Sequence, residues 1–198
     1  MKKTTIISTI ATIVTALVLP LFISGCYTNT VDTFGTFTVQ IPLDFTSKWR
    51  NKSAPDTSLD FTDLNNYKEY RDNKDDIQRT IFYQFAYWID SIRVPLTDPG
   101  VDKLEFDFVR YYLYFEGEPA SSKHLLGEFK KVKVKDYFRI PHVIAIPDDV
   151  GKILETAAKT RTRFYTVAEY SAPTSGGSGY FPYIDSRFDL VVRLELKL

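Results

Sequence analysis

The chain has 198 residues, with 25 basic and 25 acidic side chains and a formal net charge of zero. This balance offers no excess of positive charge for a nucleic acid, so no nucleic-acid partner is expected. The length suits one domain or two small ones, and the aromatic content of 15% favours strands.

The N-terminal segment has the organisation of a secretory leader. Lys2 and Lys3 are followed by an uncharged, mostly apolar stretch at 6–22, and small residues then precede Cys26. A charged start, an apolar core and small residues before a processing point are typical of a leader that is removed. Residues 1–25 are therefore predicted to be a signal peptide.

The run Ile23-Ser24-Gly25-Cys26 resembles the lipobox of bacterial lipoproteins. This resemblance implies cleavage before Cys26, a diacylglyceryl group on its sulfur and acylation of the new amino group. Several acyl chains hold a protein firmly to a membrane, because each buried methylene contributes about 0.8 kcal/mol. The alternative is an uncleaved transmembrane helix, since the apolar stretch approaches the roughly 17–25 residues that a span needs. Pro20 and the lack of a cationic segment after Cys26 argue against that alternative.

The residue after the cysteine bears on location. It is Tyr27, whereas the lipoprotein signal for retention in the inner membrane is an aspartate at that place. The resemblance therefore implies the outer membrane of a bacterial envelope. No acidic cluster of the kind that exports some lipoproteins follows Cys26, so the periplasmic face is favoured over the cell surface. Residues 26–33 are expected to be the lipidated cysteine and a tether, and 34–198 a single β-sandwich domain.

Strand patterns begin directly after the tether. Residues 37–41 alternate apolar and polar side chains, and Pro42 is expected to close that strand or to place it at a sheet edge. The Ser, Pro, Asn and Asp content of 46–58 predicts a loop. A short surface helix is predicted within 61–78. The segment 79–94 fits either a helix face or a strand buried on both sides, and its β-branched and aromatic content favours the strand.

The C-terminal half is also predicted to be mainly strand. The clearest helix pattern is at 147–160, where Asp148 or Asp149 can cap the start. Its apolar stripe comprises Val150, Ile153, Leu154, Ala157 and Ala158. The segment 187–198 alternates apolar and polar residues almost throughout, so one face should be core and the other mostly solvated. Further strands are expected at 104–116, 127–138, 142–147 and 161–170, and turns or loops at 96–103, 117–124 and 171–183.

Together these elements predict a mainly β protein. The expected fold is an antiparallel β-sandwich with an immunoglobulin-like or similar layout and one or two short helices. The cysteine–tryptophan–cysteine signature of true immunoglobulin domains is absent. In its general pattern the body also resembles uncharacterised β-rich lipoproteins of Gram-negative bacteria, a likeness that implies no particular activity.

Motifs for catalysis or metal binding are not found in the sequence. His124 and His142 have no other histidine or cysteine beside them, and 72–76 lacks the glycine and glutamate of a calcium-binding loop. Glu105 and Asp107 stand two apart on a predicted strand, opposite an apolar face, and are expected to form an ordinary outward face. We therefore expect a protein that is not an enzyme and that uses neither a metal nor a cofactor.

The remaining feature is the aromatic excess. The candidate binding residues are Tyr180, Phe181 and Tyr183, in the glycine-rich loop at 171–183. A second group, Tyr111, Tyr112 and Tyr114, lies late on the strand predicted at 104–116. Exposed rings can stack on sugar faces or anchor a protein partner. The alternative is that both groups are core or loop-base packing.

Two functions stay open at this point. The first is a lipid-anchored envelope protein that acts as a non-enzymatic binding or structural module, with an envelope protein as its partner. The second is a glycan-binding or glycan-processing envelope lipoprotein. A sugar binder should show a groove with two or more coplanar exposed rings, and a hydrolase should add two carboxylates about 5–9.5 Å apart.

Overall fold

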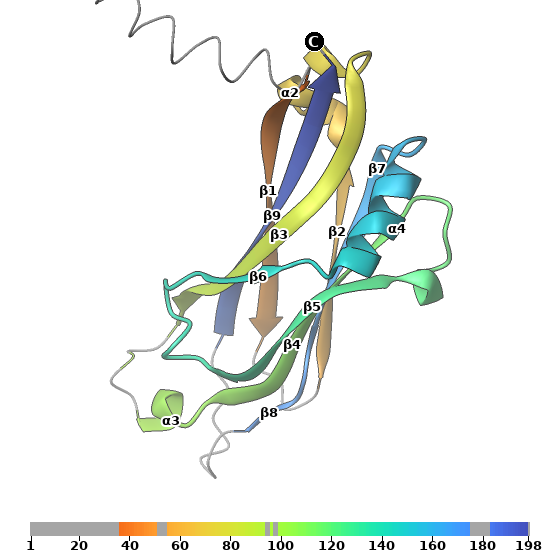
Figure 1. Ribbon diagram of the computed structural model, residues 1–198. Helices are drawn as coiled ribbons and strands as arrows, with labels where there is room; N and C mark the ends of the chain where they lie inside the picture. The colour runs from red at the N-terminus through yellow and green to blue at the C-terminus, as the bar shows by residue number, and fades with distance from the viewer. Residues whose placement is uncertain (1–35, 51–54, 94–95, 97–98, 175–182, 198) are drawn as a thin grey trace, which may run out of the picture.

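The computed structural model describes residues 36–50, 55–93, 96, 99–174 and 183–197. They form two antiparallel sheets that pack face to face (Figure 1). The four-stranded sheet has the order β1 (Thr36–Arg50), β9 (Tyr183–Lys197), β3 (Ile77–Ile92) and β6 (His142–Ala145). The five-stranded sheet has the order β2 (Asp56–Asp63), β7 (Arg163–Tyr170), β4 (Glu105–Phe115) and β5 (His124–Lys133), with the two-residue β8 (Pro173–Thr174) paired to β4. The predicted mainly β, antiparallel sandwich is confirmed.

The strand order identifies the layout as a jelly roll. Leaving out β8, the chain changes sheet at every connection between strands except the hairpin from β4 to β5. The order 1-9-3-6 therefore faces the order 2-7-4-5, which is the arrangement of two interleaved Greek keys. The layout expected from the sequence is immunoglobulin-like or similar. The strand order corrects this to a jelly roll.

The core lies between the sheets and is rich in rings. Tyr111 of β4 stacks on Phe188 of β9, with centroids 4.4 Å apart and planes 5° apart. The inward side chains of β9, from Ile184 to Leu196, are buried at every second position. The alternation predicted at 187–198 is therefore confirmed up to Lys197, the last described residue, and the strand begins earlier, at Tyr183.

The predicted loop at 46–58 is wrong over much of its length. Strand β1 continues through Pro42 to Arg50, and β2 begins at Asp56. The residues at 46–50 pair with β9 and bury Ser47 and Trp49, while their polar neighbours face outward. Pro42 is tolerated because β1 is an edge strand. One side of an edge strand has no neighbouring strand, so a backbone N–H is not required on that side.

The strand favoured at 79–94 is confirmed as β3. Irregularities in its pairing explain why its apolar residues fit the spacing of a helix as well as that of a strand. Its pairing with β9 shifts register at three places, one of them between Phe82 and Gln84. A bulge changes which alternate residues face inward. Thr80 and Phe82 are buried before this bulge, and Phe85 and Tyr87 after it. This phase change produces a spacing that also fits a helix.

The helix predicted within 61–78 is much shorter than that range. Phe61 belongs to β2, a 3-10 turn occupies Leu64–Asn66, and α2 covers only Lys68–Asn73. The chain then enters β3 at Ile77. Two other short elements are α3 (Pro99–Asp102) and a 3-10 turn at Ala120–Ser122.

The C-terminal helix is confirmed as α4 (Asp148–Ala158), with a correction to its cap. The N-cap residue is Pro147, so Asp148 and Asp149 lie in the first turn and act on the helix dipole instead of capping. Only Leu154 and Ala158 of the predicted stripe are buried, and Ile153 is exposed. Helix α4 packs mainly against β3, beyond the end of the short β6. Within the described part of the chain, no helix is long and apolar enough to cross a membrane.

Candidate functional site

Apolar and aromatic side chains cover the outward face of the five-stranded sheet. Two rows of cross-strand neighbours form this surface. In one, Phe61 lies opposite Tyr165, which lies opposite Tyr114. In the other, Leu59, Val167, Tyr112 and Leu125 follow one another across β2, β7, β4 and β5. We call these seven residues the aromatic band.

The band is exposed at its edges and packed at its centre. The exposed fraction is 58% for Leu59, 45% for Phe61 and 38% for Leu125. Tyr114 is nearly covered, because its ring stacks on Tyr165 at 5.1 Å with planes 18° apart. Phe61 continues the row on the other side of Tyr165, at 5.0 Å. Neighbouring rings therefore hold one another in place and present a preformed apolar surface.

A row of charges borders the band where β7 begins. Arg163 donates to Asp63 across 2.9 Å and lies 3.5 Å from Glu116. Burial alone would raise the pKa of Asp63, but hydrogen bonds from Arg163 and Asn65 outweigh it and lower that pKa. The Asp63 carboxylate is therefore ionised and paired with Arg163 at neutral pH.

A second charged row borders the band on the side toward the end of β7. Arg110 donates to Glu128 across 2.8 Å, and Lys123 pairs with Glu169. The Lys123 ammonium also lies 4.3 Å from the centroid of the Tyr112 ring, at the edge of the band. An apolar centre with a charged rim is the usual anatomy of a protein–protein interface.

The outward face of the four-stranded sheet is different in character. Along β9 it presents Arg187, Asp189, Arg193 and Glu195, between inward residues that are buried. Glu195 pairs with Arg79 of β3, and Arg193 lies over the ring of Tyr83 at 4.2 Å. Charged residues therefore dominate this face along β9, whereas the face of the five-stranded sheet carries the aromatic band across its strands.

The sequence-predicted site residues fall in different places. Cys26, Tyr180 and Phe181 lie outside the residues that the structure describes. Tyr183 is the first residue of β9 instead of a loop residue, and 40% of it is exposed. Its ring lies 5.7 Å from the guanidinium of Arg50.

The tyrosines of the predicted strand at 104–116 separate onto two faces. Tyr111 is core, as the packing alternative stated, whereas Tyr112 and Tyr114 belong to the aromatic band. Only part of this group therefore reaches the outer surface.

Sequence reasoning missed Leu59, Phe61, Leu125 and Tyr165. The available signal was the alternation in β2, where apolar Leu59 and Phe61 stand between polar residues. In a half-buried strand such alternation usually places the apolar residues in the core. In β2 the apolar Leu59 and Phe61 face outward and the polar residues that alternate with them face inward. Its inward Ser58 and Asp60 instead line a cavity of about 10 Å³ at the open edge between the sheets.

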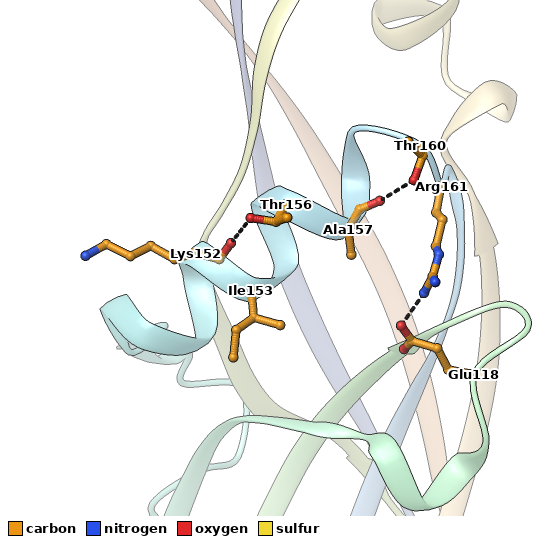
Figure 2. Close-up of a pocket in the computed structure, with 7 residues that line it drawn as sticks. All are labelled: Glu118, Lys152, Ile153, Thr156, Ala157, Thr160 and Arg161. Carbon is orange, nitrogen blue, oxygen red and sulfur yellow. Dashed lines mark hydrogen bonds and ion pairs between the residues drawn. The ribbon is translucent and has the colours of Figure 1, made fainter.

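A second hollow lies beside α4 (Figure 2). It has a volume of about 560 Å³ and is lined by Lys152, Ile153, Thr156, Ala157, Thr160, Arg161 and Glu118. Ile153 extends into it, and the ion pair between Arg161 and Glu118 closes one side. The Thr156 hydroxyl donates to the carbonyl of Lys152, so it is occupied within the helix. The hollow thus combines apolar contact from Ile153 and Ala157 with the polar side chains at its border.

The candidate carboxylates and histidines of the sequence lie in the strands of the sandwich. Glu105 and Asp107 both pair with Lys131, at 3.6 and 2.6 Å. His124 and His142 open β5 and β6, and the ring of His142 stacks on Tyr137 at 3.8 Å. Over the described ranges, no group of three or more His, Cys, Asp or Glu residues is placed to hold a metal ion.

No protein-family model matches the chain, and no curated protein matches it. Among solved structures, the chain is similar to the decameric BFDV capsid protein at 9% identity and a TM-score of 0.39, over 80% of this chain and 98% of that one. It is similar to desmodium yellow mottle tymovirus at 10% identity and a TM-score of 0.36, over 82% of this chain and 89% of the other. It is also similar to infectious bursal disease virus, Gx strain, at 10% identity and a TM-score of 0.36, over 82% of this chain and 32% of that one. Likenesses this weak say nothing about what this chain binds, and the jelly-roll assignment follows from its own strand order.

Proposed function

We propose that the chain is a lipid-anchored module of a bacterial envelope that binds another protein through the aromatic band. The anchor is the acylated Cys26 implied by the lipobox resemblance. Tyr27 after it favours the outer membrane, and the lack of an acidic cluster after Cys26 favours the periplasmic face. The observation that carries the binding role is the exposed apolar surface of the band between two charged rows. Contiguous exposed apolar patches with polar rims mark interaction sites on soluble domains.

The ring geometry of the band favours a protein partner over a sugar. Rings that lie side by side in one plane keep their centroids more than about 6 Å apart, because their edges meet at van der Waals contact. Tyr114 and Tyr165 have centroids 5.1 Å apart with nearly parallel planes, so they are stacked. Each ring covers a face of the other, and that face is not available to a sugar. Protein side chains, in contrast, can pack against ring edges and the exposed Leu59.

Photo-cross-linking in intact envelopes tests this proposal. A benzophenone-bearing amino acid replaces Phe61 in the band or Tyr83 on the opposite sheet. These two residues are 45% and 44% exposed, so they form a matched pair. We expect adducts with one envelope protein from position 61, several-fold above those from position 83.

The band itself must be responsible for that adduct. Adding Leu59→Ser to the cross-linker variant should remove the adduct, because this leucine is the most exposed residue of the band. A serine at Tyr83 should leave the adduct in place. Equal yields from the two cross-linker positions, or an adduct that survives Leu59→Ser, would contradict the proposal.

A further inference from the structure

Cations gather around Tyr183 at one end of the four-stranded sheet. Arg50, at the end of β1, is the cross-strand neighbour of Tyr183. Arg93 directly follows β3, and its backbone N–H donates to the carbonyl of Tyr183 across 3.1 Å. The guanidinium carbons of Arg50 and Arg93 lie 5.7 and 5.2 Å from the centroid of the Tyr183 ring. Two arginines therefore approach one ring from the two strands beside it.

The acidic residues nearby are already engaged. Asp185 accepts from Arg50 at 2.5 Å through Oδ1 and from the Ser91 hydroxyl at 2.9 Å through Oδ2. Burial by itself would raise the pKa of Asp185, but these hydrogen bonds outweigh it and lower that pKa. Oδ1 of Asp90, the residue before Ser91 on β3, lies 3.7 Å from Nε of Arg187 on β9. Asp185 is thus paired with Arg50 within the cluster, and Asp90 is paired with Arg187.

Among the described residues, two cations of this cluster have no carboxylate within ion-pair distance, although the charge of Lys48 helps to lower the pKa of Asp185. Lys48 lies opposite Asp185 in the register, but the closest ion pair of Asp185 is with Arg50. In the part of the chain that the structure describes, no carboxylate lies within ion-pair distance of Lys48 or Arg93, and both side chains are exposed. Arg187 and Asp90 match each other in charge, so the described residues around Tyr183 comprise three further cations, Lys48, Arg50 and Arg93, and one carboxylate, Asp185.

We propose that this cluster binds a ligand that carries phosphate groups, held by Arg50 and Arg93 on either side of Tyr183. Guanidinium groups form bidentate, charge-assisted hydrogen bonds with phosphate oxygens, and Lys48 adds a third positive charge. The net excess of two positive charges matches a dianionic phosphate. Arg50 is held in place by Asp185 and by the carbonyl of Ile184, so part of the site is preorganised.

The position of the cluster separates it from the aromatic band. It lies on the outward face of the other sheet, and at the opposite end of β1 from Thr36, where the chain enters the sandwich (Figure 1). A phosphate ligand here therefore neither needs nor blocks a protein on the band. This inference is independent of the proposed function.

Nuclear magnetic resonance titration of the full lipidated chain in detergent tests the site. Inorganic pyrophosphate is the soluble probe, and detergent micelles that contain phosphatidylglycerol or phosphatidylcholine present headgroups. We expect pyrophosphate to shift the Nε–H resonances of Arg50 and Arg93 and the ring resonances of Tyr183. Arg93→Gln should raise the dissociation constant about tenfold, the usual cost of losing a hydrogen bond to a charged group.

A matched control separates a built site from general attraction. Arg193 lies over the Tyr83 ring on the same sheet face, so Arg193→Gln removes the same charge from a similar arrangement. It should leave pyrophosphate binding unchanged. If pyrophosphate shifts these resonances and phosphatidylglycerol micelles do not, the ligand is a soluble phosphorylated molecule. Shifts with phosphatidylglycerol micelles that Arg93→Gln abolishes, and that phosphatidylcholine micelles do not cause, assign a lipid headgroup. Equal weakening by the two variants, or binding of neither probe, would overturn the proposal.

Discussion

Asp44 and Asp189 lie directly opposite each other on β1 and β9, on the outward face of the four-stranded sheet. Burial, followed by the neighbouring Asp44, raises the pKa of Asp189 to about 7, and Arg187 opposes this only in part. In the unfolded chain the pKa of an aspartate is about 3.9. The folded state therefore holds this proton more tightly. Its contribution to stability is fully present below about pH 4 and is lost as the pH rises through about 7.

We predict that Asp189→Asn raises the free energy of unfolding at pH 8 by on the order of 1–3 kcal/mol over that of the parent. At pH 4 the two proteins should have nearly equal free energies of unfolding. The neutral amide permanently replaces the protonated carboxyl. Urea unfolding of both proteins at the two pH values measures the difference. Asp107→Asn is the control, because Asp107 is exposed and paired with Lys131. A gain for Asp189→Asn of the same size at both pH values would refute the coupling to Asp44.

At the scale of elements, two glycines should respond in opposite directions to the same substitution. A Cβ on Gly127 of β5 would lie 2.7 Å from the ring of Phe85, which is fully buried. Gly127→Ala should therefore cost about 1–3 kcal/mol, as overpacking does in well-packed cores. A Cβ on Gly151 of α4 meets nothing within 4 Å, so Gly151→Ala should add about 1 kcal/mol of helix propensity. Thermal unfolding of the two variants checks the signs. A tolerated alanine at 127 would mean that β5 does not pack on Phe85 as described.

For the whole molecule, membrane attachment and folding should be separable. The chain has a single cysteine, so no disulfide within the chain can stabilise the sandwich, and burial between the sheets must do so. We predict that Cys26→Ser abolishes incorporation of a labelled fatty acid and cleavage of the leader. The unfolding midpoint of the body should stay unchanged. Metabolic labelling, membrane fractionation and thermal unfolding measure these three properties. A serine variant that is still cleaved and sorted like the parent would disprove the lipid anchor.

The sequence by itself determined those features that depend on local order. The strand β9 and the amphipathic helix α4 could be predicted because each buries one side of a regular period. The lipobox is a contiguous chemical signal, so it was readable in the same way and stays a prediction for Cys26. The long β3 was predictable as a strand from its composition, although its bulges disturbed its period.

Only the tertiary structure decided which faces are buried and which strands are neighbours. Leu59 and Phe61 face outward because their register on β7 sets them opposite Val167 and Tyr165 on the outer face of the sheet, and no local pattern states that register. The aromatic band unites residues from β2, β4, β5 and β7, which are adjacent only in the jelly-roll order. Likewise, Arg50, Arg93 and Tyr183 meet because β1 and β3 both flank β9. Sites assembled across strands depend on register and sheet order, and these are set by long-range burial.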